Sequence, residues 1–266
     1  MVNFDTLFPD NRLSKDDPLD QAKCILLRIL KIVDFICKEN NLIYWLDYGT
    51  LLGAVRHKGF IPWDDDIDIA MPRKSYDALI AMADDVFPQD LFVQSKESDP
   101  ELRKGIRWLK IRDKYSTAIE NHEIDKDIKH HQGISIDIFP IEEFNQPQSY
   151  LRAKKFTYSK FHIISKNILV PIFNRLIRAE EGKYIATALE IDFNAYFPRE
   201  DIFPLSRIEF ENEFFSAPNN PHNILTRRYG DYMLIPAKED RLIHHGIIKP
   251  TTPCSHQKAL DWDKRN

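Results

Sequence analysis

The segment GFIPWDDDIDIAMP, residues 59–72, places four aspartates within five positions and surrounds them with bulky apolar residues: Asp64, Asp65, Asp66 and Asp68. Along a β-strand successive side chains point to opposite faces, so Asp66 and Asp68 share one face with Asp64. Ile67 and Ile69 point to the opposite face. Because a buried carboxylate is costly unless it is paired or bound to a cation, the segment predicts a strand with one face in the core and a cation site on the other.

A second segment, GISIDIFPI, repeats the pattern at residues 133–141, with isoleucines on one face and Asp137 on the other. If the two strands are neighbours, Asp137 joins Asp66 and Asp68 in a site of three carboxylates. Such a site, without a local His or Cys, favours Mg²⁺ or Mn²⁺ over zinc. We therefore predict that these three aspartates are the catalytic residues and the metal ligands. Two alternatives are a solvated acidic turn and an Asp137 that is paired with an arginine.

Protein-bound Mg²⁺ usually keeps positions open for substrate phosphates, so this site predicts phosphoryl transfer. The turn YGT, residues 48–50, offers the backbone N–H groups and hydroxyl of Gly49 and Thr50 at the expected start of a helix, where phosphate binds favourably.

Three basic residues are the expected partners for phosphate charge: Arg56, Lys58 and Lys110. The first two precede the acidic strand directly, and Lys110 lies in the strand candidate 106–113. Taken singly, such residues are more typical of ordinary surface charge than of ligand binding. Together with Gly49 and Thr50 they form the predicted substrate-binding set.

The fold class predicted from the hydrophobic periodicity is α+β, with a mixed sheet flanked by helices and a mainly helical C-terminal half. We expect a catalytic core over 1–145 and a helical region over 146–266 that packs on the core and shapes an acceptor cleft. The elements predicted in the core are helices over 16–41, 49–59 and 72–87 and strands over 42–48, 90–95 and 106–113. Beyond the core, long helices are expected over 148–169 and 179–197.

Four of the nine histidines occur as two tandem pairs, which we expect to be solvated: His130 with His131, and His244 with His245. The first pair lies in the polar segment EIDKDIKHHQ, which is typical of a mobile loop.

Composition excludes several classes of protein. The 37 basic and 41 acidic residues give no electrostatic reason for binding nucleic acid. Three cysteines without a CxxC pair indicate reduced thiols. No apolar run approaches the roughly 18 residues of a membrane span, and no signal peptide is evident, so we expect a cytoplasmic protein.

Three segments in order resemble the motifs of the LicD-type phosphocholine transferase family, whose distant relatives include the fukutin-type ribitol-phosphate transferases: 44–79, 133–144 and 225–241. The family is similar in its core to the nucleotidyltransferase superfamily, whose pattern is a Gly-Ser/Thr turn, a carboxylate pair on one strand and a third carboxylate on a neighbouring strand. Gly49 with Thr50, Asp66 with Asp68, and Asp137 match those positions. Residues 145–205 show no motif of this kind.

The resemblance implies transfer of phosphocholine or a similar phospho-alcohol from CDP-choline or a related CDP-alcohol. The implied acceptor is a hydroxyl of a cell-surface glycan such as teichoic acid or lipopolysaccharide. Trp45, Tyr48 or Trp63 would offer a ring face to the choline cation. A lipid-linked acceptor would require a peripheral contact at the inner face of the cell membrane, which no stretch of the sequence identifies.

Two other functions remain open. One is a nucleotidyltransferase that attaches NMP to a small acceptor with the same carboxylates. The other is a noncatalytic glycan-binding or assembly protein, although a degenerate relative would have little reason to keep all three carboxylates.

Overall fold

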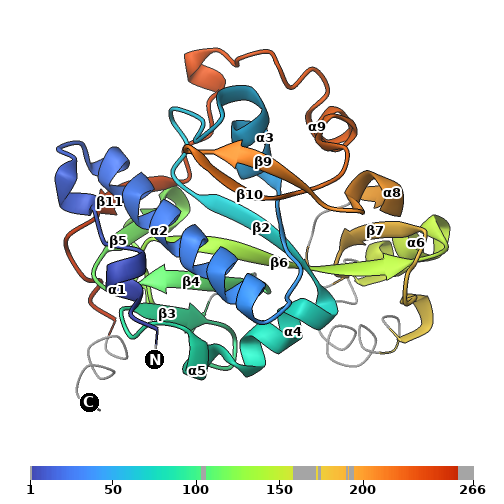
Figure 1. The fold of residues 1–266 in the computed structure, drawn as a ribbon, viewed down its shortest axis with the longest axis horizontal. Helices are drawn as coiled ribbons and strands as arrows, with labels where there is room; N and C mark the ends of the chain where they lie inside the picture. The colour runs from blue at the N-terminus through green and yellow to red at the C-terminus, as the bar shows by residue number, and fades with distance from the viewer. Residues whose placement is uncertain are drawn as a thin grey trace.

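The computed structural model describes residues 2–102, 106–157, 172, 175–189, 191 and 195–256. Its centre is a seven-stranded sheet in the order β1-β2-β6-β4-β3, with β7 paired to β6 and β8 paired to β7 (Figure 1). The pair β2 and β6 is parallel and the other pairs are antiparallel. The strands are β1 Trp45–Leu46, β2 Ile67–Pro72, β3 Leu91–Gln94, β4 Leu109–Asp113, β6 Ser135–Phe144, β7 Tyr184–Thr187 and β8 Tyr196–Pro198. The expected α+β fold with a mixed sheet flanked by helices is confirmed.

The apolar side of the sheet packs with helix α2, Pro18–Glu39, which crosses the strands in Figure 1. Asp17 caps this helix by accepting hydrogen bonds from the backbone N–H groups of Leu19 and Asp20, and Pro18 occupies the first turn, where its missing N–H costs no helical bond. The isoleucines of β2 and β6 are fully buried in the same core: Ile67, Ile69, Ile136 and Ile138.

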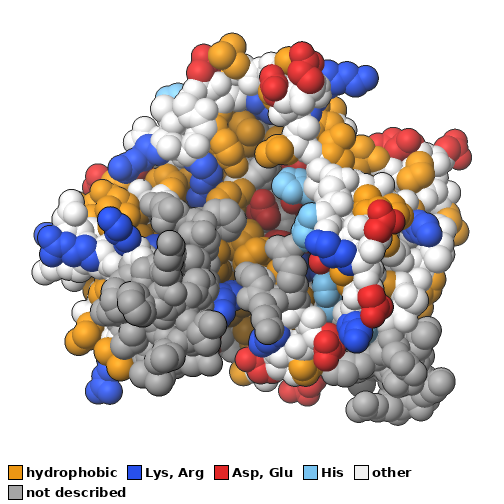
Figure 2. All heavy atoms as spheres, turned by 180° about the vertical axis from the view of Figure 1, so that it is seen from behind, with side chains coloured by type: hydrophobic (Ala, Val, Ile, Leu, Met, Phe, Trp, Pro, Cys, Tyr) orange, Lys and Arg blue, Asp and Glu red, His pale blue; other side chains and the backbone are white. Residues whose placement is uncertain are grey.

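The opposite side of the sheet carries the charged residues. In the parallel register Asp68 lies across from Asp137, and in the antiparallel register Lys110 of β4 lies across from the same Asp137. The two acidic strands are therefore neighbours, which was the condition for a site of three carboxylates. From behind, Figure 2 shows acidic and histidine side chains within a hollow that hydrophobic side chains border.

The acidic strand is shorter than the sequence predicts, because Asp64, Asp65 and Asp66 precede β2 in a loop. Asp64 N–H donates to the carbonyl of Ile61, which closes a turn after Pro62. The partner strand β1 is only two residues long, so pairing cannot extend further back.

The other elements of the first half follow the expected order, although the predicted helix over 72–87 is two helices, α4 and α5. Their bounds are α1 Phe4–Leu7, η1 Arg12–Ser14, α3 Tyr48–His57, α4 Arg73–Ala81, α5 Ala83–Val86, β5 Thr117–Glu120 and η2 Asn121–Glu123.

The C-terminal half contains more strand than expected. A helix over 179–197 was predicted, but residues 184–187 and 196–198 form β7 and β8. β6 continues to Phe144 beyond its pairing with β4, and its open edge there pairs with β7. Helix α6, Pro147–Thr157, agrees with the start of the helix predicted over 148–169, and positions 158–169 lie outside the described residues. The remaining elements are α8 Arg199–Ile202, β9 Ser206–Phe210, β10 Glu213–Ala217, α9 Pro221–Tyr229, η3 Lys238–Asp240 and β11 His245–Lys249.

The sheet runs across position 145 through the pairing of β6 with β7, while the division into regions 1–145 and 146–266 stays a prediction. Strands β9 and β10 form a hairpin, and β11 pairs with β5. The three cysteines are free thiols, as expected. No helix formed by the described residues is both long enough and apolar enough to cross a bilayer.

The prediction of a solvated pair at His130 and His131 is wrong, since both side chains are buried. His131 accepts a hydrogen bond from the backbone N–H of Gly133 at 3.0 Å and packs against the ring of Phe92. Burial lowers the pKa of both histidines, because it penalises the charged imidazolium.

Candidate active site

Helix α3 begins directly beside the carboxylates. The hydroxyl of Thr50 accepts a hydrogen bond of 2.8 Å from the backbone N–H of Asp68, which joins the first turn of α3 to β2. A Cβ atom added at Gly49 would lie 3.1 Å from Oδ2 of Asp64, closer than most such contacts. Glycine thus permits the close approach of the helix start to the acidic loop. The structure brings Gly49 and Thr50 to the carboxylates.

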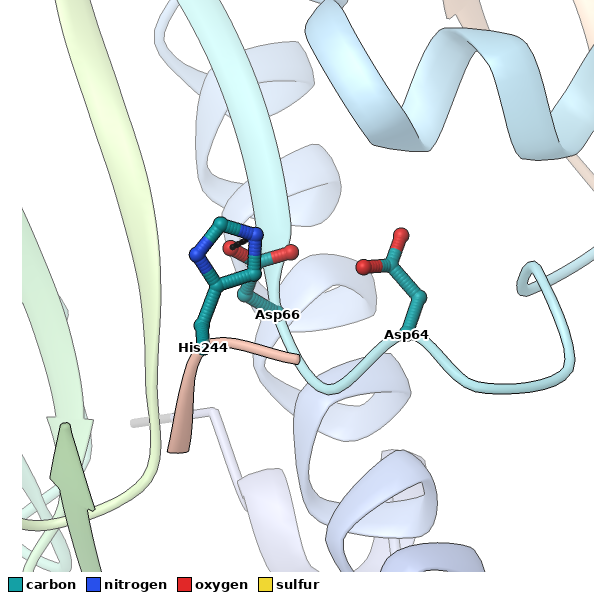
Figure 3. Close-up of side chains that lie close together, drawn as sticks. All are labelled: Asp64, Asp66 and His244. Atoms are coloured by element: carbon teal, nitrogen blue, oxygen red, sulfur yellow. Dashed lines mark ion pairs between the residues drawn. The ribbon is translucent and has the colours of Figure 1, made fainter. Parts of the chain in front are cut away.

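Asp64 and Asp66 face His244, which comes from the segment before β11 (Figure 3). One ligand atom from each of the three residues lies within 4.8 Å of the others, so the group could hold a metal ion. Nε2 of His244 lies 3.8 Å from Oδ2 of Asp66. The side chain of His244 is 49% exposed, so it is solvated as the sequence predicts, and it also faces Asp66.

The neighbouring Asp65 holds the His244 segment in place. Its Oδ2 accepts a hydrogen bond from the backbone N–H of His245 at 2.9 Å and contacts Nδ1 of the same residue at 3.1 Å. Although burial acts to raise the pKa of Asp65, the bonds from His245 lower it below its usual range. Asp65 is thus a charged group that binds His245, while Asp64 and Asp66 on either side of it face His244.

Asp137 has different partners from the loop aspartates. Nζ of Lys110 lies 2.6 and 2.8 Å from its two carboxylate oxygens, and the indole N–H of Trp108 donates to it at 2.7 Å. The Lys110 and Asp137 side chains are 8% and 15% exposed, so this is a largely buried ion pair. The structure therefore places Asp137 beside Asp68 and pairs it with a lysine, whereas the sequence suggested an arginine as the alternative partner.

The carboxylates raise one another's pKa. Burial, then repulsion from Asp66 and Asp65, raises the pKa of Asp64 to about 8. Burial is also the largest cause that raises the pKa of Asp66, while His244 acts in the opposite direction. The pKa of Asp68 lies well above its usual range because of burial and the charges of Asp66 and Asp137. Such crowding is what a bound cation would relieve.

Comparison with known proteins agrees with this arrangement. The family described as LicD/FKTN/FKRP, nucleotidyltransferase domain, matches residues 41–179, more than half of the chain. The chain belongs to this LicD family. The match includes β1 through β6 and therefore every predicted site residue.

Proteins similar to the chain are named for different activities. The chain is 29% identical over 261 residues to "Lipopolysaccharide cholinephosphotransferase LicD" of Haemophilus influenzae, covering 85% of this chain and 96% of that protein. It is 28% identical over 156 residues to "Mannosyltransferase regulator 4" of Saccharomyces cerevisiae, covering 57% of this chain and 12% of that protein. A stretch of 28 residues is 57% identical to "Ribitol 5-phosphate transferase FKRP" of Homo sapiens, covering 10% of this chain and 6% of that protein.

The predicted basic residues of this LicD family member occupy different surroundings. Arg56 donates to the backbone carbonyls of Tyr232 and Leu234 at 2.8 and 3.3 Å. Burial lowers its pKa, although the charge of Asp64 opposes the change. Lys58 ends α3 in a left-handed conformation with φ 57°, and its Nζ lies 3.1 Å from Glu209 of β9. Lys110 is in direct contact with a predicted catalytic aspartate, whereas the ion pair of Lys58 points it toward β9.

Arg228 of α9 is a site-forming residue that sequence reasoning missed. Its guanidinium donates to Oδ1 of Asp47 at 2.6 Å and lies 3.7 Å from the ring centre of Tyr48. Asp47 in turn donates its backbone N–H to the carbonyl of Asp68. Burial acts to lower the pKa of Arg228, yet the charge of Asp47 raises it above its usual value. The LicD motif over 225–241 contains this arginine and was the available signal.

The three candidate aromatic residues for a choline cation differ in their surroundings. Trp45 is buried in the core and packs edge-on against Phe203. The guanidinium of Arg241 covers the ring of Trp63 at 4.1 Å. Tyr48 lies between Arg228 and the ring of Phe139, and Phe139 in turn packs against Trp108. Of the three, Tyr48 is the one in a row of aromatic rings that leads to Asp137.

Proposed function

We propose that the protein transfers phosphocholine, or a similar phospho-alcohol, from a CDP-linked donor to a hydroxyl of a cell-surface glycan. The observation that carries the proposal is the cluster of Asp64, Asp66 and Asp68, whose pKa values are raised, beside Asp137 on the neighbouring strand. The chain also aligns with nearly the whole length of a lipopolysaccharide cholinephosphotransferase. Such a cluster binds a cation and, with it, a diphosphate.

Two overlapping donor sets are candidates for a metal ion. Among the described residues, Asp64, Asp66 and His244 have ligand atoms within 4.8 Å of one another, whereas joint ligation by Asp66, Asp68 and Asp137 stays a prediction. Asp66, Asp68 and Asp137 offer only oxygen atoms, which suits Mg²⁺ and Mn²⁺. Asp64, Asp66 and His244 include an imidazole, which suits Mn²⁺ better than Mg²⁺. The bound ion would neutralise the donor diphosphate and the leaving CMP.

The chain's own residues supply binding and proton transfer in this proposal. The acceptor oxygen forms a bond to the phosphorus of phosphocholine, the bond from that phosphorus to the bridging oxygen breaks, and CMP leaves with the electron pair. Asp137 receives the hydroxyl proton. Backbone N–H groups at Gly49 and Thr50 bind phosphate oxygens, and Lys110 with Arg56 balances the charge that develops on CMP. Lys58 would contribute only after it leaves Glu209, and its role stays a prediction.

The test is CMP release from a panel of CDP-alcohols with Mg²⁺ or Mn²⁺, with and without candidate glycans. Asp66→Asn and Asp68→Asn should each lower turnover at least about a hundredfold in a folded protein, since a lost metal ligand removes several kcal/mol of charge stabilisation. Full activity in either variant would end the metal-site proposal. A glycan that gains a nucleotide mass would indicate a nucleotidyltransferase. Donor binding without any CMP release would indicate a noncatalytic protein.

A further inference from the structure

An exposed group of large apolar side chains lies between α9 and β11, and we name it the apolar loop. Its members are Met233, Leu234, Ile235, Leu242 and Ile243, which are 56%, 69%, 58%, 76% and 56% exposed. Single exposed apolar residues are common on soluble proteins, but five within eleven positions are not. Figure 1 shows this orange-red segment along the top edge of the molecule.

Fixed contacts hold the backbone on which these side chains stand. Arg56 donates to the carbonyls of Tyr232 and Leu234, and Tyr232 is itself buried beside His222. At the other end Asp65 binds the backbone N–H of His245. The backbone on each side of the apolar loop is therefore bonded to the site, while its side chains extend into solvent.

The apolar loop borders the candidate active site. Ile243 directly precedes His244, which faces Asp66, and the Leu234 carbonyl shares Arg56 with the helix that begins at the carboxylates. Whatever the acceptor carries beyond its reacting sugar would therefore meet this surface.

We propose that the apolar loop inserts into the lipid surface in which a lipid-linked acceptor is anchored. This proposal rests on the proposed function, because the relative that aligns over nearly its full length is named for a lipid-bearing glycan. The exposed apolar residues form two short stretches, 233–235 and 242–243, which Pro236 and the charged turn η3 separate. A bilayer accepts such exposed apolar side chains without matching their shape.

The size and charge of the loop decide between a bilayer and other occupants. A stable dimer needs roughly 20–30 residues from each partner, far more than these five. Residues 231–241 contain two basic and three acidic residues, so attraction to anionic lipid cannot drive the contact. Insertion therefore depends on apolar burial, and it should persist on zwitterionic lipid and at high salt.

The experiment is flotation of the full chain with phosphatidylcholine vesicles at 0.1 and 1 M salt, repeated with phosphatidylglycerol added. The test variant is Ile235→Ser with Leu242→Ser, whose side chains are 58% and 76% exposed. The matched control is Leu7→Ser with Leu13→Ser, 52% and 79% exposed in the N-terminal elements. We expect the wild type and the control to float at both salt concentrations and the test variant to partition at least about tenfold less, because two apolar anchors are lost.

Equal flotation of the test and control variants, or no flotation of the wild type, would overturn the proposal. So would a concentration-dependent dimer in light scattering that the test variant abolishes, because that result assigns the loop to a second copy. Measurements of CMP release separate failure of the membrane proposal from failure of the proposed transferase function. The test variant should keep wild-type turnover on a water-soluble glycan and lose it on the same glycan anchored in vesicles, whereas absence of turnover in every protein would reject the transferase activity alone.

Discussion

Replacing Asp64 by asparagine should stabilise the metal-free protein at alkaline pH and leave it unchanged at acidic pH. The folded-state pKa of Asp64 is about 8, above its ordinary value of 3.8, because of burial and the charges of Asp66 and Asp65. Between pH 3.8 and about pH 8, Asp64 of the folded chain keeps a proton that it has released in the unfolded chain. Folding stability therefore falls as pH rises through this window, and the Asp64→Asn substitution would remove that dependence.

The shift in the pKa of Asp64 sets the size of the expected change in the free energy of unfolding. A difference of about four pKa units corresponds to an upper limit on the order of 5 kcal/mol. Asp66 and Asp68 share the same repulsion, so removing one charge relieves only part of it, and we expect about 2–3 kcal/mol at pH 8. For a chain of this length that is a rise in melting temperature of about 5–10 °C.

The assay is thermal unfolding in EDTA at intervals from pH 4 to pH 9, comparing wild type, Asp64→Asn and Asp16→Asn. The last variant removes the same charge from an exposed position and should follow the wild type. An Asp64→Asn curve parallel to the wild type at every pH would refute the reasoning. A variant less stable than the wild type at pH 8 would show that Asp64 is a charged structural group.

Three further predictions concern single contacts. His244→Ala should lower CMP release more with Mn²⁺ than with Mg²⁺, because imidazole is a softer ligand than carboxylate and suits Mn²⁺ better. We expect the ratio of the Mn²⁺ rate to the Mg²⁺ rate to fall by about tenfold, and an unchanged ratio would remove His244 from the metal site. Asp137→Ala should destabilise the protein in EDTA by about 3 kcal/mol, because Lys110 loses its buried partner. A melting temperature at or above the wild-type value would show instead that repulsion among the carboxylates dominates. Arg228→Lys should lower both melting temperature and turnover, because lysine cannot reproduce planar stacking on a ring, and wild-type values in both assays would contradict that role.

The two faces of β2 and of β6 were predictable because the signal is local and physical, whereas the pairing of the two strands was a condition of the sequence argument. Each strand alternates buried isoleucines with an aspartate, and burying one face fixes which side chains reach the other. The cap at Asp17 was equally readable, since it depends on the residues that follow it directly. Both inferences use side-chain periodicity or neighbours within one turn.

Other features depended on contacts that no local pattern contains. His244 and Arg228 reach the site from segments far along the chain, and only tertiary packing decides that they face Asp66 and Asp47. Residues 179–197 contain helix-favouring alanine and glutamate, but Tyr184–Thr187 pairs with the edge of β6 and forms a strand instead. Tertiary context overrides intrinsic propensity at such positions.

Asp47 and Asp65 bond to residues that are far away along the sequence, and this separation affects the order in which the site forms during translation. Their partners Arg228 and His245 follow them by 181 and 180 residues. A ribosome that has completed β8 has already synthesised every strand of the central sheet, while α9 and β11 are still to be translated. Throughout that interval the nascent chain holds its carboxylates without the arginine, the histidines or the apolar loop. The candidate site is thus completed last, after translation has passed His245.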